Sequence, residues 1–221
     1  IFALHDENII LKVGPSVEMC EAEAMRFVAR ETRIPVPEVI KSYMEDGNGY
    51  IFMSRLEGEP LGDCWAQLSP DLRSVVVHQL AGYLQELSSL HGDFYGALWH
   101  QPSKDIFFMH LPFRSEQVRY GPYHSRQQYN EGLIKALENS TPTASLAGLE
   151  EGLIDKLMNN NDDTKVFSHG DLQPMNVLVD KSTGRITGIL DWESAGFSIR
   201  GREYYEAKAR ARSEAWSDAL D

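Results

Sequence analysis

The sequence is poor in cysteine, in basic residues and in long apolar runs. It has two cysteines, Cys20 and Cys64, in 221 residues. That is too few for a disulfide scaffold, so we expect two reduced, packed thiols in a cytoplasmic protein. No apolar run reaches the roughly 18–20 residues that a membrane helix needs, and the N-terminal residues lack the form of a signal peptide. We therefore expect no membrane partner.

Basic residues are outnumbered, with 21 Lys and Arg against 33 Asp and Glu and a net charge of −12. A nucleic-acid partner would need a basic stripe, which this balance argues against. The chain is 42% hydrophobic and 24% charged. This content excludes a disordered chain and is enough for a sizeable core, in one large domain or two small lobes.

The first 56 residues predict a small α+β unit. A β-branched and apolar run over 8–13 is typical of a strand, and good helix formers follow over 18–30. Strands are expected over 38–44 and 50–56. The turn between them is expected at Asp46-Gly47-Asn48-Gly49, where Asn-Gly is a strong hairpin signal.

The rest of the chain predicts a larger, mainly helical unit. Gly and Pro over 57–62 indicate a linker, and Ser69-Pro70-Asp71 begins a long helix that ends near His91. The aromatic-rich segment 92–125 is either an irregular stretch held to the core by its rings or part of a substrate pocket. Helices are also expected near 126–138, 146–159 and 202–220, and short strands over 165–168, 177–180 and 185–190.

The chemistry-bearing residues gather around one predicted hairpin. A turn at 181–184 folds the flanking strands together, which places Asn176 and Asp191 at the same open end. Asp171 precedes Asn176 by five residues, in a loop that can curl back over that end. Magnesium prefers hard oxygen ligands and few protein ones, which suits Asn176 and Asp191. Asp171 can then accept a proton from an attacking hydroxyl, although a single loop Asp can also simply cap a turn.

The pattern His169-x-Asp171-x-x-x-x-Asn176, followed by Asp191, resembles the kinase catalytic loop and its metal-binding Asp. With His-Gly-Asp and Asp-Trp-Glu, the chain is more similar to the aminoglycoside phosphotransferase and choline kinase-like family. The resemblance implies an α+β, two-lobed protein-kinase-like fold with a small β-rich N-lobe and a larger, mainly helical C-lobe. We place the N-terminal nucleotide-binding lobe at 1–56, the hinge at 57–62 and the C-terminal catalytic and substrate lobe at 63–221.

By the same resemblance, the N-lobe supplies the nucleotide contacts. Lys12 corresponds to the strand lysine that holds the α- and β-phosphates, and Glu21 to the helix glutamate that pairs with it. Glu23 is the second candidate for that partner, because the sequence does not fix the helix register. The Ser54 carbonyl and the Leu56 amide correspond to the hinge groups that contact adenine. No Gly-x-Gly-x-x-Gly precedes Lys12, and residues 4–8 stand where a phosphate-covering loop would end. Either the preceding strand and loop lie outside this sequence, or a short turn replaces them.

The resemblance implies catalysis by Asp171 as the base, with His169 organising the loop. The expected activity is transfer of the γ-phosphoryl group of ATP, with Mg²⁺, onto a hydroxyl of an aminoglycoside-, choline- or natural-product-like small molecule. The alternative is a catalytically degenerate kinase-like protein that binds a ligand or partner without phosphoryl transfer. The absent glycine motif favours this alternative, and the intact Asp171, Asn176 and Asp191 oppose it.

Overall fold

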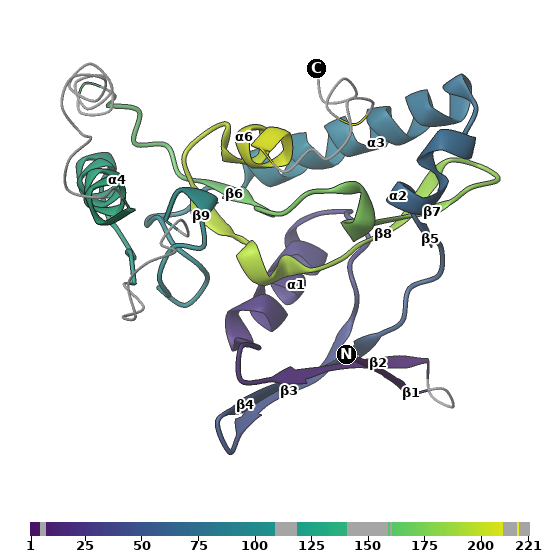
Figure 1. Cartoon of the computed structure of the whole chain (residues 1–221), viewed down its shortest axis with the longest axis horizontal. Coiled ribbons are helices and arrows are strands. Elements are labelled where there is room, and N and C mark those ends of the chain that lie inside the picture. Colours follow the sequence, from purple (N-terminus) through teal and green to yellow (C-terminus); the bar gives the residue numbers. More distant parts are fainter. Residues whose placement is uncertain (5–7, 109–118, 141–158, 160, 210–215, 217–221) are drawn as a thin grey trace.

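The computed structural model describes residues 1–4, 8–108, 119–140, 159, 161–209 and 216, and it has a two-lobed α+β architecture (Figure 1). Its first lobe is a four-stranded antiparallel sheet in the order β1-β2-β4-β3, which packs against helix α1. These elements are β1 (Phe2–Leu4), β2 (Ile9–Gly14), α1 (Met19–Glu31), β3 (Val39–Glu45) and β4 (Asn48–Ser54).

The β3–β4 hairpin turns within the predicted segment 46–49, at its first two residues. Glu45 pairs with Asn48, so Asp46 and Gly47, with φ of 48° and 76°, form the two-residue turn. Gly49 lies inside β4, where an added Cβ would stand 2.0 Å from the Val17 carbonyl oxygen. The glycine is therefore needed for close packing of the strand, so the Asn48-Gly49 part of the predicted turn belongs to β4.

The second lobe is built around helix α3 (Pro70–Ser89), which the sequence predicted well. The Ser69 hydroxyl accepts a hydrogen bond from the Leu72 amide at 3.3 Å, as an N-cap should. Among the described residues, no helix is long and apolar enough to cross a membrane. The remaining helices and strands of this lobe are β5 (Glu59–Pro60), α2 (Leu61–Cys64), α4 (Arg126–Ser140), β6 (Val166–Ser168), β7 (Val177–Asp180), β8 (Arg185–Ile189), β9 (Gly196–Ser198) and α6 (Arg202–Ala209).

The segment 57–62 is not simply a linker. Its Glu59 and Pro60 form β5, the edge strand of a β5-β7-β8 sheet, and α2 begins at Leu61. An edge strand tolerates proline because one of its sides makes no ladder hydrogen bonds, so the Pro signal did not exclude a strand. The helix predicted over 202–220 is described as α6 over 202–209. Of the helix predicted over 146–159, all residues but 159 lie outside the described residues.

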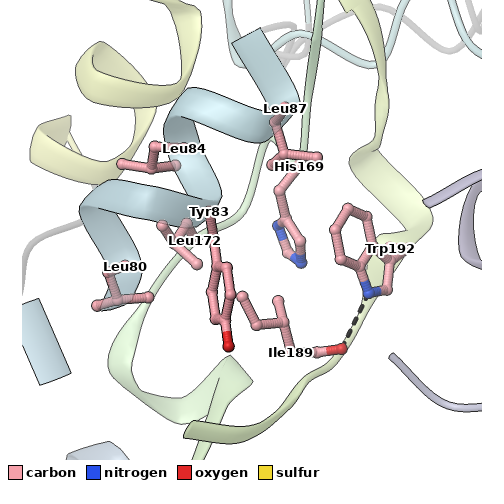
Figure 2. A pocket seen from close by; sticks show the side chains of 8 residues that line it. All are labelled: Leu80, Tyr83, Leu84, Leu87, His169, Leu172, Ile189 and Trp192. Carbon is pink, nitrogen blue, oxygen red and sulfur yellow. Dashed lines mark hydrogen bonds between the residues drawn. The ribbon is translucent and has the colours of Figure 1, made fainter. Parts of the chain in front are cut away.

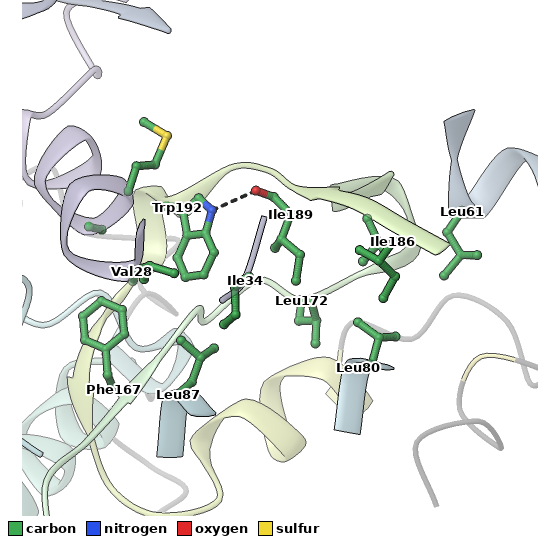
Figure 3. Close-up of a cluster of buried hydrophobic side chains, with 14 of the residues drawn as sticks. Val28, Ile34, Leu61, Leu80, Leu87, Phe167, Leu172, Ile186, Ile189 and Trp192 are labelled. Atoms are coloured by element: carbon green, nitrogen blue, oxygen red, sulfur yellow. Dashed lines mark hydrogen bonds between the residues drawn. The ribbon is translucent and has the colours of Figure 1, made fainter. Parts of the chain in front are cut away.

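A single large hydrophobic core connects α1, β4, α3 and the β7–β8 hairpin (Figure 3). Val28, Ile34, Leu87 and Trp192 are each at most 3% exposed and belong to this one cluster. Cys64 also belongs to it, and both cysteines are buried free thiols. The elements that carry the predicted site are thus fixed by shared apolar packing.

The described part of the aromatic segment packs mainly into the interior. Phe94 joins the large core, while Tyr95, Phe108 and Tyr120 form a second cluster with Tyr129 of α4. Most of these rings therefore hold an irregular chain in place, as the first of the two interpretations expected.

Candidate active site

The β7–β8 hairpin brings Asn176 and Asp191 to the same end. Val177 pairs with Ile189, and the Leu190 amide donates to the Asn176 carbonyl at 2.8 Å. At the other end, Asp180 Oδ1 accepts a hydrogen bond from the Ser182 amide at 2.9 Å, which stabilises the predicted turn. Asp191 itself has left-handed backbone angles, with φ 63° and ψ 66°.

Asp171 curls back onto Asn176, as the loop length suggested. The Asn176 Nδ2 donates to the Asp171 carbonyl oxygen at 2.8 Å and to its Oδ2 at 3.1 Å. Gln173 Nε2 donates to the same Oδ2 at 3.1 Å. Because the amide nitrogen of Asn176 is turned toward Asp171, its Oδ1 is the atom that can bind a cation.

His169 is a buried residue that organises the loop. Its Nδ1 accepts a hydrogen bond from the Asp171 amide at 3.1 Å, so Nε2 carries the proton and donates to the Leu190 carbonyl at 2.8 Å. The ring is 1% exposed and lies against Trp192, with centroids 4.5 Å apart, in the apolar surroundings of Figure 2. Both ring nitrogens are therefore occupied, and His169 acts through the position of its neighbours.

Lys12 lies at the centre of an acidic cluster that joins the two lobes. Its Nζ is 2.9 Å from Glu21 Oε1, 2.9 Å from Asp191 Oδ1 and 3.1 Å from Glu193 Oε2. Glu23 pairs with Arg26 instead, so the structure selects Glu21 of the two candidates. Which face of α1 meets the sheet is set by packing, and no pattern in the helix sequence alone could decide it.

The ionisation of this cluster is set by burial and by the lysine. Burial opposes the charge of Lys12, but the attraction of Glu21 and its hydrogen bonds to Glu21 and Asp191 raise the pKa of the ammonium overall. Burial raises the pKa of Glu21 to about 7, against the attraction of Lys12. Lys12 therefore stays positively charged while its buried partner titrates near neutrality.

A pocket of about 370 Å³ opens beside this cluster. This volume lies within the usual range of small-molecule sites. The Ser54 and Arg55 amides donate to the Glu38 and Asn8 carbonyls, which fixes the backbone of the predicted hinge. Asp171 is not among the lining residues and meets them through Asn176. All six predicted cofactor and metal residues line the pocket, namely Lys12, Glu21, Ser54, Leu56, Asn176 and Asp191.

The residues present fit a magnesium ion better than a metal held by many side chains. Within the described ranges, no group of three or more His, Cys, Asp or Glu side chains could hold a metal. Asn176 and Asp191 offer one amide and one carboxylate oxygen, and magnesium takes its other ligands from water and phosphate. These two residues would hold the ion.

The sequence interpretation missed two residues that contact the site, Glu193 and Glu203. Glu193 was noted in the Asp-Trp-Glu sequence but given no role, although its place two residues after Asp191 could have indicated one. Glu203 of α6 accepts hydrogen bonds from the His169 and Gly170 amides, and no local pattern indicates this contact. Strand β1 ends at Leu4 and pairs antiparallel with β2. Residues 5–7 of the segment 4–8 lie outside the described residues.

The family model of the "Phosphotransferase enzyme family" matches residues 4–218. The chain belongs to this family. Among its relatives, an aminoglycoside 3'-phosphotransferase of Streptomyces ribosidificus is 27% identical over 77% of this chain and 57% of its own length. A subtelomeric hrmA-associated cluster protein of Aspergillus fumigatus is 32% identical over 48% of this chain and 21% of its own length. The chain thus spans only about a fifth to somewhat over half of these curated relatives.

Two solved structures share the fold of this phosphotransferase family member. An aminoglycoside-3'-phosphotransferase of type VIII aligns over 96% of this chain and 75% of its own, with a TM-score of 0.55 and 20% identity. A putative fructosamine-3-kinase from Haemophilus somnus 129PT aligns over 96% of this chain and 72% of its own, with a TM-score of 0.52 and 15% identity. The kinase-like fold is thereby shown independently of any single motif.

Proposed function

We propose that this protein is an ATP- and magnesium-dependent phosphotransferase that moves the γ-phosphoryl group onto a hydroxyl of a small molecule. ATP supplies the transferable group, and the magnesium ion neutralises the developing charge on its phosphates. The names of its relatives suggest an aminoglycoside-like or sugar-derived acceptor, and choline-like and natural-product alcohols belong to the same chemical class of acceptor.

The observation that supports this proposal is the convergence of Lys12, Asn176 and Asp191 on one pocket, with Asp171 hydrogen-bonded to Asn176. Phosphoryl transfer requires little covalent chemistry from a protein, so catalysis depends mainly on positioning and on charge. Lys12 would hold phosphate oxygens, Ser54 and Leu56 would contact adenine, and Asp171 would orient the acceptor hydroxyl and take its proton.

The test is the thermal stability of the protein with ATP, compared with and without Mg²⁺. A ligand at one hundred times its dissociation constant stabilises a folded protein by about 2.7 kcal/mol, so Tm should rise with ATP and rise further with Mg²⁺. Asp191→Ala and Asp191→Asn should lose the magnesium-dependent part of the rise and keep a folded structure. An undiminished magnesium effect in both variants would remove Asp191 from the metal site.

Glu57→Gln is a matched control, because Glu57 is an exposed residue just outside the residues that line the pocket. It should respond to ATP and Mg²⁺ as the unmodified protein does. If ATP binds normally but no panel of hydroxyl acceptors, nor water, supports turnover, the degenerate binding protein becomes the better interpretation. The absence of any ATP effect would contradict the proposed ATP-dependent activity.

A further inference from the structure

Helix α1 is preceded by a glutamate whose side chain contacts the other lobe. Glu18 occupies the N-cap position of α1, but among the described residues its side chain accepts no capping hydrogen bond from the helix amides. Glutamate is also not one of the usual N-cap residues, which are Ser, Thr, Asp and Asn. Instead, Glu18 Oε1 accepts a hydrogen bond from Lys104 Nζ at 2.8 Å. Lys104 lies between α3 and α4 in the larger lobe, so this ion pair joins the two lobes.

Lys104 is held in place by the residue that follows it. Asp105 is buried, and its Oδ2 accepts hydrogen bonds from the Tyr129 hydroxyl of α4 and, at 2.5 Å, from the Ser198 hydroxyl of β9. Its Oδ1 lies 2.9 Å from Arg202 Nε of α6. Three elements of the larger lobe thus fix Asp105, and Lys104 extends from this fixed point to the start of α1.

The contact between Lys104 and Glu18 is a charged pair. Partial burial opposes the charge of Glu18, but the hydrogen bond and the charge of Lys104 lower the pKa of its carboxyl overall, with smaller contributions from Cys20 and Arg119. Both partners remain partly exposed to solvent, and ion pairs of this kind contribute little to global stability. The pair is therefore expected to act on the position of α1 more than on folding.

Glu18 lies one helical turn before Glu21, the residue that pairs with Lys12. The Glu21 amide donates to the Glu18 carbonyl at 3.2 Å, and residues three apart are neighbours on a helix. Glu21 is buried, and its Oε1 lies 2.9 Å from Lys12 Nζ. A shift of the start of α1 would therefore reach the Lys12–Glu21 pair through a single turn of helix.

We propose that Lys104 is a positioning residue for the nucleotide site, and that it holds the start of α1 from the larger lobe through Glu18. This inference rests on the proposed function, because the lysine that Glu21 orients is the one that would hold the phosphates of ATP. Neither Lys104 nor Glu18 is among the described residues that line the nucleotide pocket. Their loss should therefore weaken ATP binding indirectly, through a less firmly held Lys12.

The experiment is a double-mutant cycle measured by ATP affinity. The dissociation constant of ATP with Mg²⁺ is determined for Lys104→Met, Glu18→Gln and the double variant. Each single variant should bind ATP about two- to fivefold more weakly, which corresponds to the usual contribution of an ion pair of this exposure. The double variant should bind ATP no more weakly than the single variant with the larger loss, because both changes break the same contact. Lys104→Arg keeps the charge and should bind ATP nearly as well as the unmodified protein.

Lys181→Met is the matched control. Lys181 forms an ion pair with Glu59 at 2.6 Å, and both side chains are about half exposed. Neither residue is among the described residues that line the pocket, so this variant should bind ATP as the unmodified protein does. Hydrogen exchange of the first-turn amides of α1 is measured in the same proteins. These amides should exchange faster in Lys104→Met and Glu18→Gln, and at the unmodified rate in Lys104→Arg and in the control.

Unchanged ATP affinity in either single variant overturns the proposal, and so does a loss in the double variant equal to the product of the two single losses. A loss in the control as large as that in Lys104→Met also overturns it, because the effect would then be one of general charge. Weaker ATP binding with unchanged exchange of the α1 amides does the same. If the unmodified protein does not bind ATP, the proposed function fails, and amide exchange alone then decides whether Lys104 holds the helix.

Discussion

At the scale of single residues, the site is a balance of charges around one lysine. Lys12 contacts the carboxylates of Glu21, Asp191 and Glu193, so the ligand-free cluster carries more negative than positive charge. Such a cluster favours a cation, and a phosphate chain would enter it together with one. Asp171 lies just outside the cluster and is held by amide donors, which separates it from the two proposed metal ligands, Asn176 and Asp191.

We expect Asp171→Asn to remove chemistry and leave ATP binding in place. Asparagine keeps the shape of the side chain, and its oxygen can still accept from Asn176 and Gln173. General-base catalysis typically contributes about 10²–10⁴-fold, or roughly 3–5 kcal/mol of the barrier. The measurements are ATP turnover and ATP affinity for the variant and the unmodified protein. Equal turnover in the two proteins would exclude Asp171 from the mechanism.

Glu206 gives a second prediction at this scale, on stability rather than activity. It is fully buried, and burial raises the pKa of its carboxyl to about 7. The attraction of Arg202 lowers this pKa, and the repulsion of Asp105 raises it. The ordinary pKa of a glutamate side chain, as in the unfolded chain, is 4.5. Below pH 4.5 the carboxyl is protonated in both states. Between pH 4.5 and 7 only the unfolded state releases the proton, so the stability contributed by the protonated group is lost as pH rises through 7.

Glu206→Gln should therefore gain stability relative to the unmodified protein as pH rises from 5 to 8, by about 1–3 kcal/mol. Glutamine can keep the hydrogen bonds from the Ile106 amide and Arg202, because both reach the same oxygen, Oε1. Urea unfolding of both proteins at several pH values measures this difference. A difference that stays constant across the range would contradict the raised pKa.

At the scale of elements, helix starts and turns were predicted correctly where the local sequence signal was strong. The Ser69-Pro70-Asp71 sequence predicted the start of α3, and the turn at 181–184 predicted the β7–β8 hairpin. Both depend on hydrogen bonds between residues two or three apart, which a sequence displays directly. The turn predicted over 46–49 is confirmed, but only Asp46 and Gly47 form it. Gly49 lies in β4 against Val17, and such a tertiary contact leaves no local pattern.

The N-cap of α3 can be tested directly. Ser69→Ala removes the acceptor for the Leu72 amide and should lower the free energy of unfolding by about 1 kcal/mol. Ser69→Asp should restore most of the loss, because aspartate is also a good N-cap residue. Chemical denaturation of the three proteins measures the effect, and an Ala variant as stable as the unmodified protein would show that the cap contributes nothing.

At the scale of the whole molecule, the two lobes share one core. Ala22 and Met25 of α1 belong to the same buried cluster as Leu172, Ile189 and Trp192 of the larger lobe. The contacts of Glu203 with the catalytic loop and of Lys12 with Glu193 join residues far apart in the chain, so only the assembled fold could reveal them. The same resemblance that named Lys12 and Asp191 could not name these partners.

A shared core predicts that the protein unfolds in one cooperative step. All four tryptophans lie at or beyond residue 65, so their fluorescence reports on the larger lobe, whereas far-ultraviolet circular dichroism reports on both. The two thermal transitions should coincide, and ATP with Mg²⁺ should shift both together. An earlier transition by circular dichroism alone would show that the sheet of the first lobe unfolds independently.

The left-handed backbone at Asp191 has a consequence for how variants of this protein should be screened. Apart from glycine, asparagine and aspartate adopt such angles most readily, while β-branched side chains adopt them poorly. In a saturation library at this codon, some substitutions would therefore lower the amount of folded protein, and others would lower activity alone. Glycine and asparagine clones should be abundant yet inactive, whereas valine and isoleucine clones should be depleted before any assay begins. The protein level of each inactive clone must be measured before its loss of activity is attributed to the missing carboxylate.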